Sequence, residues 1–223
     1  MYFKNIHYIK IGTGNKNVLF LHGWGGSYKS FYHLKDYISK DITLYFLDIP
    51  GFGNSKLDIA YHLYDYANLI VEFIEKENIK NPLLVGHSFG GRIVLKIIEN
   101  NPFKAILIST PGIYHKTIKT RLKLFLHKYF YVSFPSRDYK NSSPLMRIVM
   151  KNILKDTVNI NLTKLKSKPI IIHGKKDKVI SIRLAKKMKR KTNGFLIKTN
   201  GGHFPQDNDP ILISKVIESY ANS

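Results

Sequence analysis

The chain has 223 residues, of which 43% are hydrophobic and 23% charged, a composition typical of one globular domain rather than of a disordered chain. It contains no cysteine, which excludes disulfide scaffolds, Cys-ligated zinc, iron–sulfur clusters and a cysteine nucleophile. No apolar run approaches the roughly 18–20 residues that cross a bilayer, and the first residues lack the pattern of a secretory signal. We therefore expect a cytoplasmic protein.

The charge is high and unevenly distributed. The 36 Lys and Arg residues against 15 Asp and Glu give a net charge of +21. Residues 1–112 carry +3, residues 113–168 carry +11 and residues 169–223 carry +7. A basic surface attracts polyanions of any kind. Lysine-rich coding in the source organism is a simpler interpretation of the overall excess, but it explains the concentration in 113–168 less well.

Short apolar runs alternate along the chain with segments of helical periodicity. Residues 2–11 alternate loosely and predict an edge strand. Continuous apolar runs of this length are typical of strands buried on both faces, and they occur at 17–21, 42–47, 82–85, 105–108 and 169–172, with a last short strand at 195–198. Helices are predicted at 63–74, 89–99 and 181–191, and after the N-cap pair Asp209-Pro210. This alternation predicts an α/β protein with a doubly wound, mostly parallel sheet of about seven strands.

One long stretch interrupts this alternation. Residues 113–168 contain no strand signal, and a second helix is predicted at 144–154. A helical apolar stripe precedes it, formed by Ile118, Leu122, Phe125, Leu126, Tyr129 and Phe130. We interpret 113–168 as a helical lid insertion in a core formed by 1–112 and 169–223.

The strongest local signal is Gly86-His87-Ser88-Phe89-Gly90-Gly91, which follows a buried strand and opens a helix. Gly-x-Ser-x-Gly in this context is a nucleophile elbow, because small residues around the serine allow a sharp turn that holds its hydroxyl clear of the sheet. The alternative is a tight structural turn. We predict that Ser88 is a nucleophile.

A glycine-rich loop, His22-Gly23-Trp24-Gly25-Gly26, closes an earlier strand. An acyl-transfer site needs two N–H donors for its tetrahedral oxyanion, and we propose those of Trp24 and Phe89. The alternative is a simple turn between a strand and a helix, in which His22 packs and forms hydrogen bonds within the loop.

A serine nucleophile needs a base and a group that orients the base. His203 lies in a loop after the last strand, and Asp177 follows the strand at 169–172. Asp207 and Asp209 are near His203 in sequence, but we expect them to cap the last helix. We expect Asp48 to stabilise a turn and His87 to pack under the elbow.

Five segments in order resemble the α/β-hydrolase superfamily over nearly the whole chain. They are 22–25, the Asp-x-Pro-Gly-x-Gly-x-Ser segment at 48–55, 86–91, 174–177 and 202–204. The order Ser88, Asp177, His203 is that of the superfamily, and the insertion lies where such enzymes carry a lid. By comparison the N-terminus is short, so we expect the first antiparallel strand to be missing.

The resemblance implies a serine hydrolase of carboxylic esters or thioesters, with no cofactor. Within the superfamily, the chain is similar to esterases that remove a methyl ester from pimeloyl chains carried on acyl carrier protein. Acyl carrier protein would be an acidic partner. The remaining histidines show no metal-ligand spacing, so no metal site is expected. We expect a monomer with a small-molecule or carrier-bound ester substrate. The alternatives are a ligand-binding or receptor protein with slow turnover, a lipase whose basic lid helix lies on lipid, and a nucleic-acid binder, for which no RNA-binding motif is present.

Overall fold

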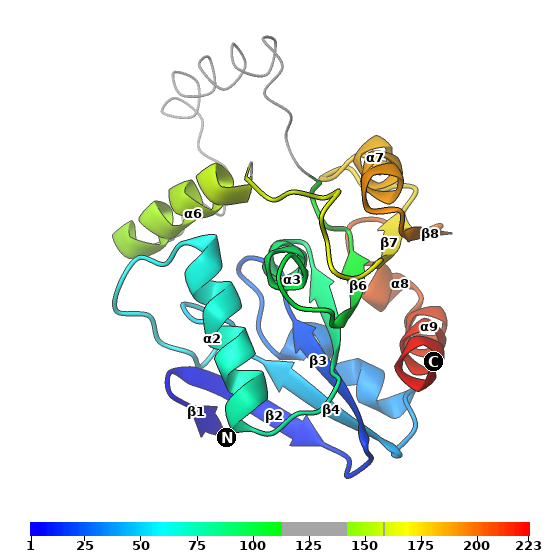
Figure 1. The fold of residues 1–223 in the computed structure, drawn as a ribbon, viewed down its shortest axis with the longest axis horizontal. Helices are drawn as coiled ribbons and strands as arrows, with labels where there is room; N and C mark the ends of the chain where they lie inside the picture. The colour runs from blue at the N-terminus through cyan, green and yellow to red at the C-terminus, as the bar shows by residue number, and fades with distance from the viewer. Residues whose placement is uncertain (113–141, 158) are drawn as a thin grey trace.

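The computed structural model describes residues 1–112, 142–157 and 159–223. In this part of the chain the strands form one sheet of order β1-β2-β4-β3-β5-β6-β7-β8 (Figure 1). They are β1 (Tyr2–Phe3), β2 (Ile6–Ile11), β3 (Lys16–Leu21), β4 (Ile42–Leu47), β5 (Leu83–His87), β6 (Lys104–Ile108), β7 (Ile170–Gly174) and β8 (Phe195–Thr199). From β4 to β8 every pairing is parallel, whereas β1 with β2 and β2 with β4 are antiparallel. The predicted α/β fold with a mostly parallel sheet is confirmed.

The N-terminal edge of the sheet differs from the expectation in one detail. The first antiparallel strand, which we expected to be missing, is present as the two-residue β1, which makes a hairpin with β2. The predicted single strand at 2–11 is therefore two strands, because Lys4 adopts a positive φ of 50° and turns the chain between them. The described sheet has eight strands, close to the seven expected.

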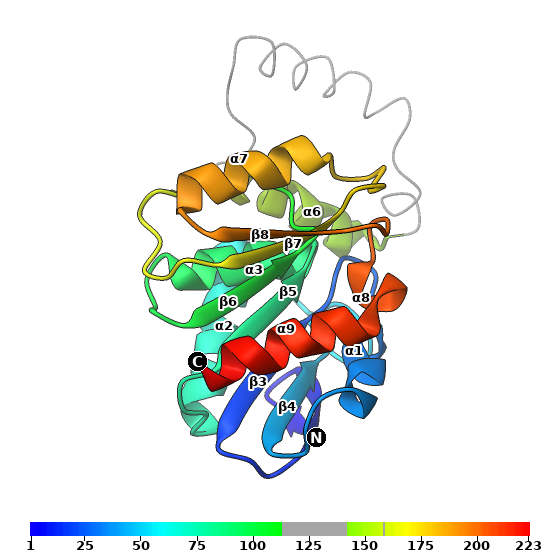
Figure 2. The ribbon, with the colours of Figure 1, turned by 90° about the vertical axis from the view of Figure 1, so that its right-hand side faces the viewer.

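Helices cover both faces of the sheet, as the alternating sequence predicts. Within the described residues the helices are α1 (Lys29–Tyr32), α2 (Leu63–Lys76), α3 (Phe89–Ile98), α6 (Pro144–Thr157), α7 (Ile182–Thr192), α8 (Pro205–Asn208) and α9 (Pro210–Asn222), with a short 3₁₀ turn, η1 (His33–Asp36), after α1. Figure 2 shows α9 and α1 in front of the sheet, with α2 and α3 behind it. Asp209 caps α9 as predicted, since its side chain accepts a hydrogen bond from Leu212 N–H.

Two hydrophobic clusters flank the sheet, because successive residues of a strand point to opposite faces. In β3, Leu19 and Leu21 belong to the cluster with α2 and α3, while Val18 and Phe20 belong to the cluster with α1 and α9. All four side chains are at most 1% exposed. The continuous apolar runs of the sequence are thus explained by burial on both sides.

The described part of the predicted insertion packs on the core. The helix expected at 144–154 is α6, and its Val149 and Ile153 are buried in the cluster that contains α2. The Asp156 carboxylate accepts a hydrogen bond of 3.0 Å from Leu63 N–H at the start of α2. The apolar stripe predicted between Ile118 and Phe130 lies outside the described residues, so the insertion boundaries 113–168 stay a prediction.

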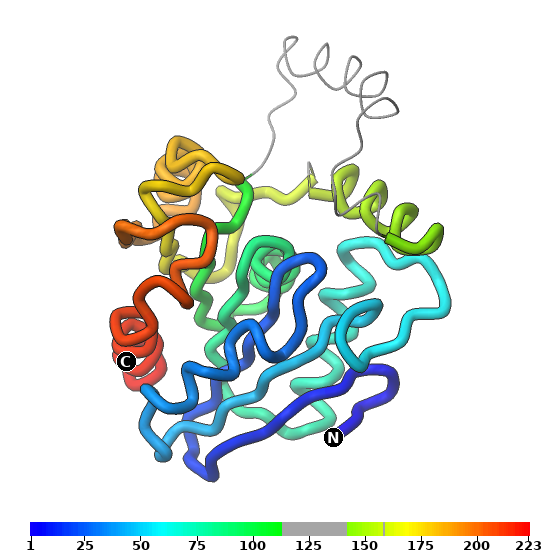
Figure 3. The backbone as a smooth tube through the Cα atoms, turned by 180° about the vertical axis from the view of Figure 1, so that it is seen from behind, coloured from blue at the N-terminus to red at the C-terminus, as the bar shows by residue number. Residues whose placement is uncertain are grey.

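The chain ends lie apart on the fold, the first residues at the β1 edge and the last at the end of α9 (Figure 3). Within residues 1–112, 142–157 and 159–223, no helix has the length and apolar character needed to cross a membrane.

Candidate active site

Ser88 lies at a sharp turn between β5 and α3. Its backbone has φ 49° and ψ −104°, a conformation that residues with a side chain rarely adopt. Glycines make the turn possible: a Cβ on Gly86 would lie 2.7 Å from the backbone of Gly90, and a Cβ on Gly90 would lie 2.1 Å from Leu21 O. The Ser88 N–H is held by Ile108 O of β6 at 2.9 Å. The turn therefore fixes the serine at the carboxyl edge of the sheet.

Asp177 follows β7 at the same edge, and its side chain is fully shielded from solvent. One carboxylate oxygen, Oδ1, accepts hydrogen bonds of 2.8 Å from the N–H groups of Val179 and Ile180. The other, Oδ2, accepts a hydrogen bond of 2.9 Å from Nδ1 of His203. Burial alone would raise the pKa of Asp177, but the hydrogen bonds from Ile180, His203 and Val179 outweigh it and lower the pKa below its usual value.

The contact with Asp177 also fixes the tautomer of His203. Because a carboxylate only accepts, Nδ1 carries the proton and Nε2 keeps its lone pair. The His203 backbone is in turn anchored beside the elbow: His87, the neighbour of Ser88, donates from Nε2 to His203 O at 2.8 Å. The His87 and His203 rings lie 4.9 Å apart. The fold thus brings the histidine loop next to the serine turn.

The loop after β3 lies against the same turn. A Cβ on Gly23 would lie 3.5 Å from Ser88 Cβ and 2.7 Å from His87 Nδ1, so only glycine fits between them. The Gly90 N–H donates to His22 O at 3.0 Å, and the rings of Trp24 and Phe89 lie 5.4 Å apart. In the described part of the chain, no protein acceptor takes a hydrogen bond from the N–H of Trp24 or of Phe89.

The two histidines given packing roles in the sequence are buried beside the serine turn. His22 Nδ1 donates to Gly23 O at 2.7 Å, and its Nε2 accepts from Ile49 N–H at 3.0 Å. Burial lowers the pKa of His22 and that of His87 to about 4, so both rings stay neutral at physiological pH.

Asp48 has the structural role expected of it. It is completely buried at the end of β4, and its carboxylate accepts hydrogen bonds from the N–H groups of Tyr28 and Asn54 and contacts Nδ1 of His7 at 2.8 Å. These contacts tie the loop before α1 to the turn at 49–55. Asp48 therefore organises the loops around the site.

Two residues near Asp177 and His203 were not anticipated correctly. Asp207 does not cap α9; it lies in α8, and its carboxylate is 3.6 Å from Nε2 of His33. The chain forms a separate turn from Pro205, which moves Asp207 away from the N-terminus of α9. His173 was given no role, yet its buried Nε2 donates to Ile180 O at 2.8 Å and lies 3.5 Å from Asp177 Oδ2. Its place four residues before Asp177 was the available signal.

The structure describes no metal centre: within residues 1–112, 142–157 and 159–223, no three His, Asp or Glu side chains are arranged to hold an ion. The expectation that the protein uses no metal or cofactor stays a prediction.

Comparisons with known proteins agree with the fold. Residues 16–111 match the family model described as alpha/beta hydrolase fold. The chain is 32% identical to a putative esterase/lipase of Mycoplasma pneumoniae, over 49% of this chain and 42% of that protein. It is 25% identical to the pimeloyl-[acyl-carrier protein] methyl ester esterase of Wigglesworthia glossinidia brevipalpis, over 94% of this chain and 95% of that protein.

One solved structure has a similar fold over nearly the whole length of the chain. The esterase EaEST from Exiguobacterium antarcticum superposes with a TM-score of 0.77 at 22% identity, covering 98% of this chain and 96% of the esterase. The segment 16–111 that matches the family model includes the glycine-rich loop at 22–26 and the turn at Ser88. The loops that carry Asp177 and His203 lie beyond this segment and follow β7 and β8 of the same sheet. By its sheet order, its strand–turn–helix elbow and these matches, the chain has the α/β-hydrolase fold.

Proposed function

We propose that the protein is a serine hydrolase that cleaves carboxylic esters or thioesters through an acyl-enzyme. Ser88 is the nucleophile, His203 the general base and acid, and Asp177 the group that orients His203. The N–H groups of Trp24 and Phe89 form the oxyanion hole. The observation that carries this proposal is the His203 ring, whose Nδ1 is bound to Asp177 while its backbone is anchored to the neighbour of Ser88.

The tautomer of His203 supports these roles. With the Nδ1 proton donated to Asp177, the free lone pair of Nε2 can take the Ser88 proton as Oγ forms a bond to the substrate carbonyl carbon. The carbonyl π electrons move to the oxygen, where the two N–H groups stabilise the negative charge. When the tetrahedral intermediate collapses, the bond to the leaving alcohol or thiol breaks and His203 returns the proton to it. Water, deprotonated by His203, then releases the acid from Ser88.

The lowered pKa of Asp177 supports its proposed role of orienting His203 and stabilising the charged form of that ring. A carboxylate that stays ionised stabilises the imidazolium formed when His203 accepts the serine proton. A serine rather than an aspartate at the elbow disfavours dehalogenase and epoxide-hydrolase chemistry.

The curated relatives support an ester as the bond cleaved, since both are named as esterases. The relative that matches almost the whole chain is named for a methyl ester on acyl carrier protein, and we propose a carrier-bound or other anionic ester as the natural substrate. The +11 charge of residues 113–168 fits such a partner by charge complementarity. Six of these basic residues are described: Arg147, Lys151, Lys155, Lys164, Lys166 and Lys168.

The central test measures hydrolysis of p-nitrophenyl esters of graded chain length. Ser88→Ala or His203→Ala should decrease kcat by roughly 10⁴–10⁶, and Asp177→Asn somewhat less. A fluorophosphonate probe should label the wild-type protein at Ser88 only. Labelling that persists in Ser88→Ala would place the nucleophile elsewhere, and an absence of turnover on every ester would favour a ligand-binding protein.

The substrate proposal is tested separately by salt. Attraction between exposed charges is screened over about 8 Å at physiological ionic strength. The kcat/KM for a carrier-bound or anionic ester should therefore fall sharply as salt is raised, while that for a neutral p-nitrophenyl ester stays nearly constant. Combined charge reversal at Arg121, Lys123 and Arg147 should produce the same loss at low salt. Equal salt dependence for both esters would contradict an anionic substrate but leave esterase activity intact.

A further inference from the structure

The solvent-facing side of α7 is entirely cationic. Six of its eleven residues are basic and none is acidic. The buried face consists of Ala185, Met188 and Thr192. Every exposed residue of α7 is basic, namely Arg183, Lys186, Lys189 and Arg190, while Lys187 and Lys191 are half-buried, as are the apolar Ile182 and Leu184.

Among the residues that the structure describes, no acidic side chain pairs with these cations. Between Asp177 and Asp207 the sequence contains eight basic residues and no acidic one. In the described part of the chain none of the six basic side chains of α7 forms an ion pair. Several of them are three or four residues apart, a spacing at which like charges destabilise a helix. General lysine usage does not account for this, because residues 1–112 balance 12 basic residues with 9 acidic ones.

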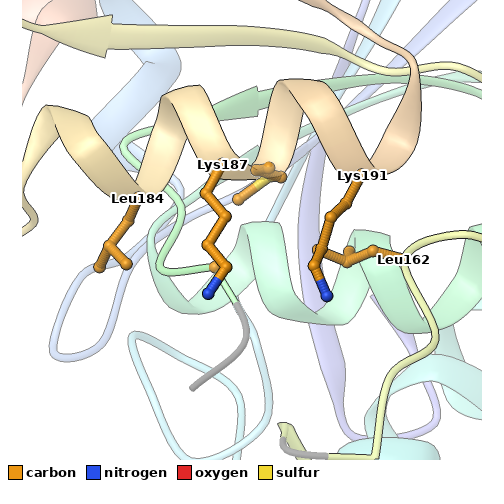
Figure 4. Close-up of a pocket in the computed structure, with 6 residues that line it drawn as sticks. Leu162, Leu184, Lys187 and Lys191 are labelled. Atoms are coloured by element: carbon orange, nitrogen blue, oxygen red, sulfur yellow. The ribbon is translucent and has the colours of Figure 1, made fainter. Parts of the chain in front are cut away.

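Apolar groups border the cationic face. Val179, before α7, is 68% exposed, and Phe195, after it, is 66% exposed. Figure 4 shows Lys187 and Lys191 extending from α7 beside Leu184 and Leu162. These four residues line a small recess together with Gly112 and Met188. The surface therefore combines amines with exposed aliphatic and aromatic carbon.

We propose that α7 and its flanking residues Val179 and Phe195 bind the surface of an anionic phospholipid membrane. Basic side chains near an anionic leaflet are attracted to its surface potential, and exposed apolar side chains gain by entering the interface. A fluid surface of phosphates needs no fixed geometry, which suits a face made mainly of lysine. A folded acidic protein would need a specific pattern of charges and hydrogen-bond acceptors to fix its orientation. The exposed residues of α7 offer only cations, so we favour a membrane as the partner.

This surface begins at the edge of the sheet that carries the candidate active site. Val179 is exposed to solvent, and its N–H donates to the Asp177 carboxylate. A membrane bound along α7 would lie next to that edge. The inference does not rest on esterase activity, since membrane binding is measured without turnover.

The test is co-sedimentation with vesicles of phosphatidylcholine alone and of phosphatidylcholine with 30% phosphatidylglycerol. We expect the wild-type protein to bind only the anionic vesicles and to be released by high salt. Each basic residue near the surface strengthens binding by about fivefold. Because four such losses multiply, the quadruple variant Arg183→Gln, Lys186→Gln, Lys189→Gln, Arg190→Gln should bind roughly 600-fold more weakly. Glutamine has a helix propensity close to that of Lys and Arg, so α7 should remain folded.

A matched variant separates this surface from net charge. Lys16→Gln, Lys40→Gln, Lys76→Gln, Lys80→Gln removes the same four charges from exposed residues near the amino ends of β3, β4 and β5. It should bind anionic vesicles nearly as well as the wild type. Equal losses in the two variants, or equal binding by wild type and α7 variant, would overturn the proposal. Binding to duplex DNA through α7 without binding to vesicles would overturn it in favour of a nucleic-acid partner.

Discussion

The strained turn at Ser88 predicts that the protein becomes more stable when the serine is replaced by glycine. Ser88 has φ 49° and ψ −104°, a backbone conformation that only glycine adopts freely because it has no Cβ. Ser88→Ala keeps the Cβ and hence the strain, whereas Ser88→Gly removes it. Both variants lack the hydroxyl, so the comparison between them isolates the backbone.

The expected difference follows from two opposing terms. A residue held in a sparsely populated backbone region costs about 1–3 kcal/mol. Removing this strain stabilises the glycine variant. Glycine also makes the unfolded chain more flexible, which lowers the free energy of unfolding by about 0.4–1 kcal/mol. Ser88→Gly should therefore be more stable than Ser88→Ala by about 0.5–2 kcal/mol. At this chain length that corresponds to an increase of a few degrees in Tm.

Urea unfolding of the two variants, followed by circular dichroism, measures this difference. The control is the same pair of substitutions at Ser219, an exposed residue inside α9. There glycine should be less stable than alanine by about 1 kcal/mol, because the backbone is helical. If Ser88→Gly were no more stable than Ser88→Ala, the turn would store no strain and the explanation of its glycines would be wrong.

Two further predictions concern carboxylates. Because the folded pKa of Asp177 is depressed, its ionised form contributes stability that is present above its unfolded pKa, about 3.9, and is lost as the pH falls through the folded value. The free energy of unfolding should thus fall more steeply below about pH 4 in the wild type than in Asp177→Asn, and equal acid sensitivity would contradict this. Asp209→Ala should destabilise the protein by about 1 kcal/mol in urea unfolding through loss of the α9 cap. Asp207→Ala should cost little, because its contact with His33 is 3.6 Å long and half-exposed.

The fold was predictable where burial dictates sequence. The strands β3 to β7 are buried on both faces, so they appear as uninterrupted apolar runs bounded by Gly, Pro, Ser or Thr. Ser88 was predictable for a related reason, since the glycines around it have no room for a side chain. Asp177 and His203 follow strands of the same parallel sheet, whose carboxyl ends share one edge.

Features that depend on short-range turns or distant partners were not predictable. β1 has only two residues, too few to show periodicity. α8 is a single turn, and nothing in the sequence separates it from α9, so Asp207 looked like a second cap. His173 points into the core at the end of β7, and only the folded Asp177 turn brings Ile180 O within reach of its ring.

The histidines around Ser88 and Asp177 illustrate how burial separates structural from chemical roles in one residue type. His22, His87 and His173 are at most 2% exposed, and each donates one ring N–H to a backbone carbonyl, of Gly23, His203 and Ile180 respectively. For His22 and His87, a pKa of about 4 keeps these contacts unchanged while the pH varies around neutrality. His203 instead donates its Nδ1 proton to the carboxylate of Asp177. The loops proposed to hold the oxyanion and the base are thus fixed in part by His22 and His87, whose rings stay neutral at physiological pH.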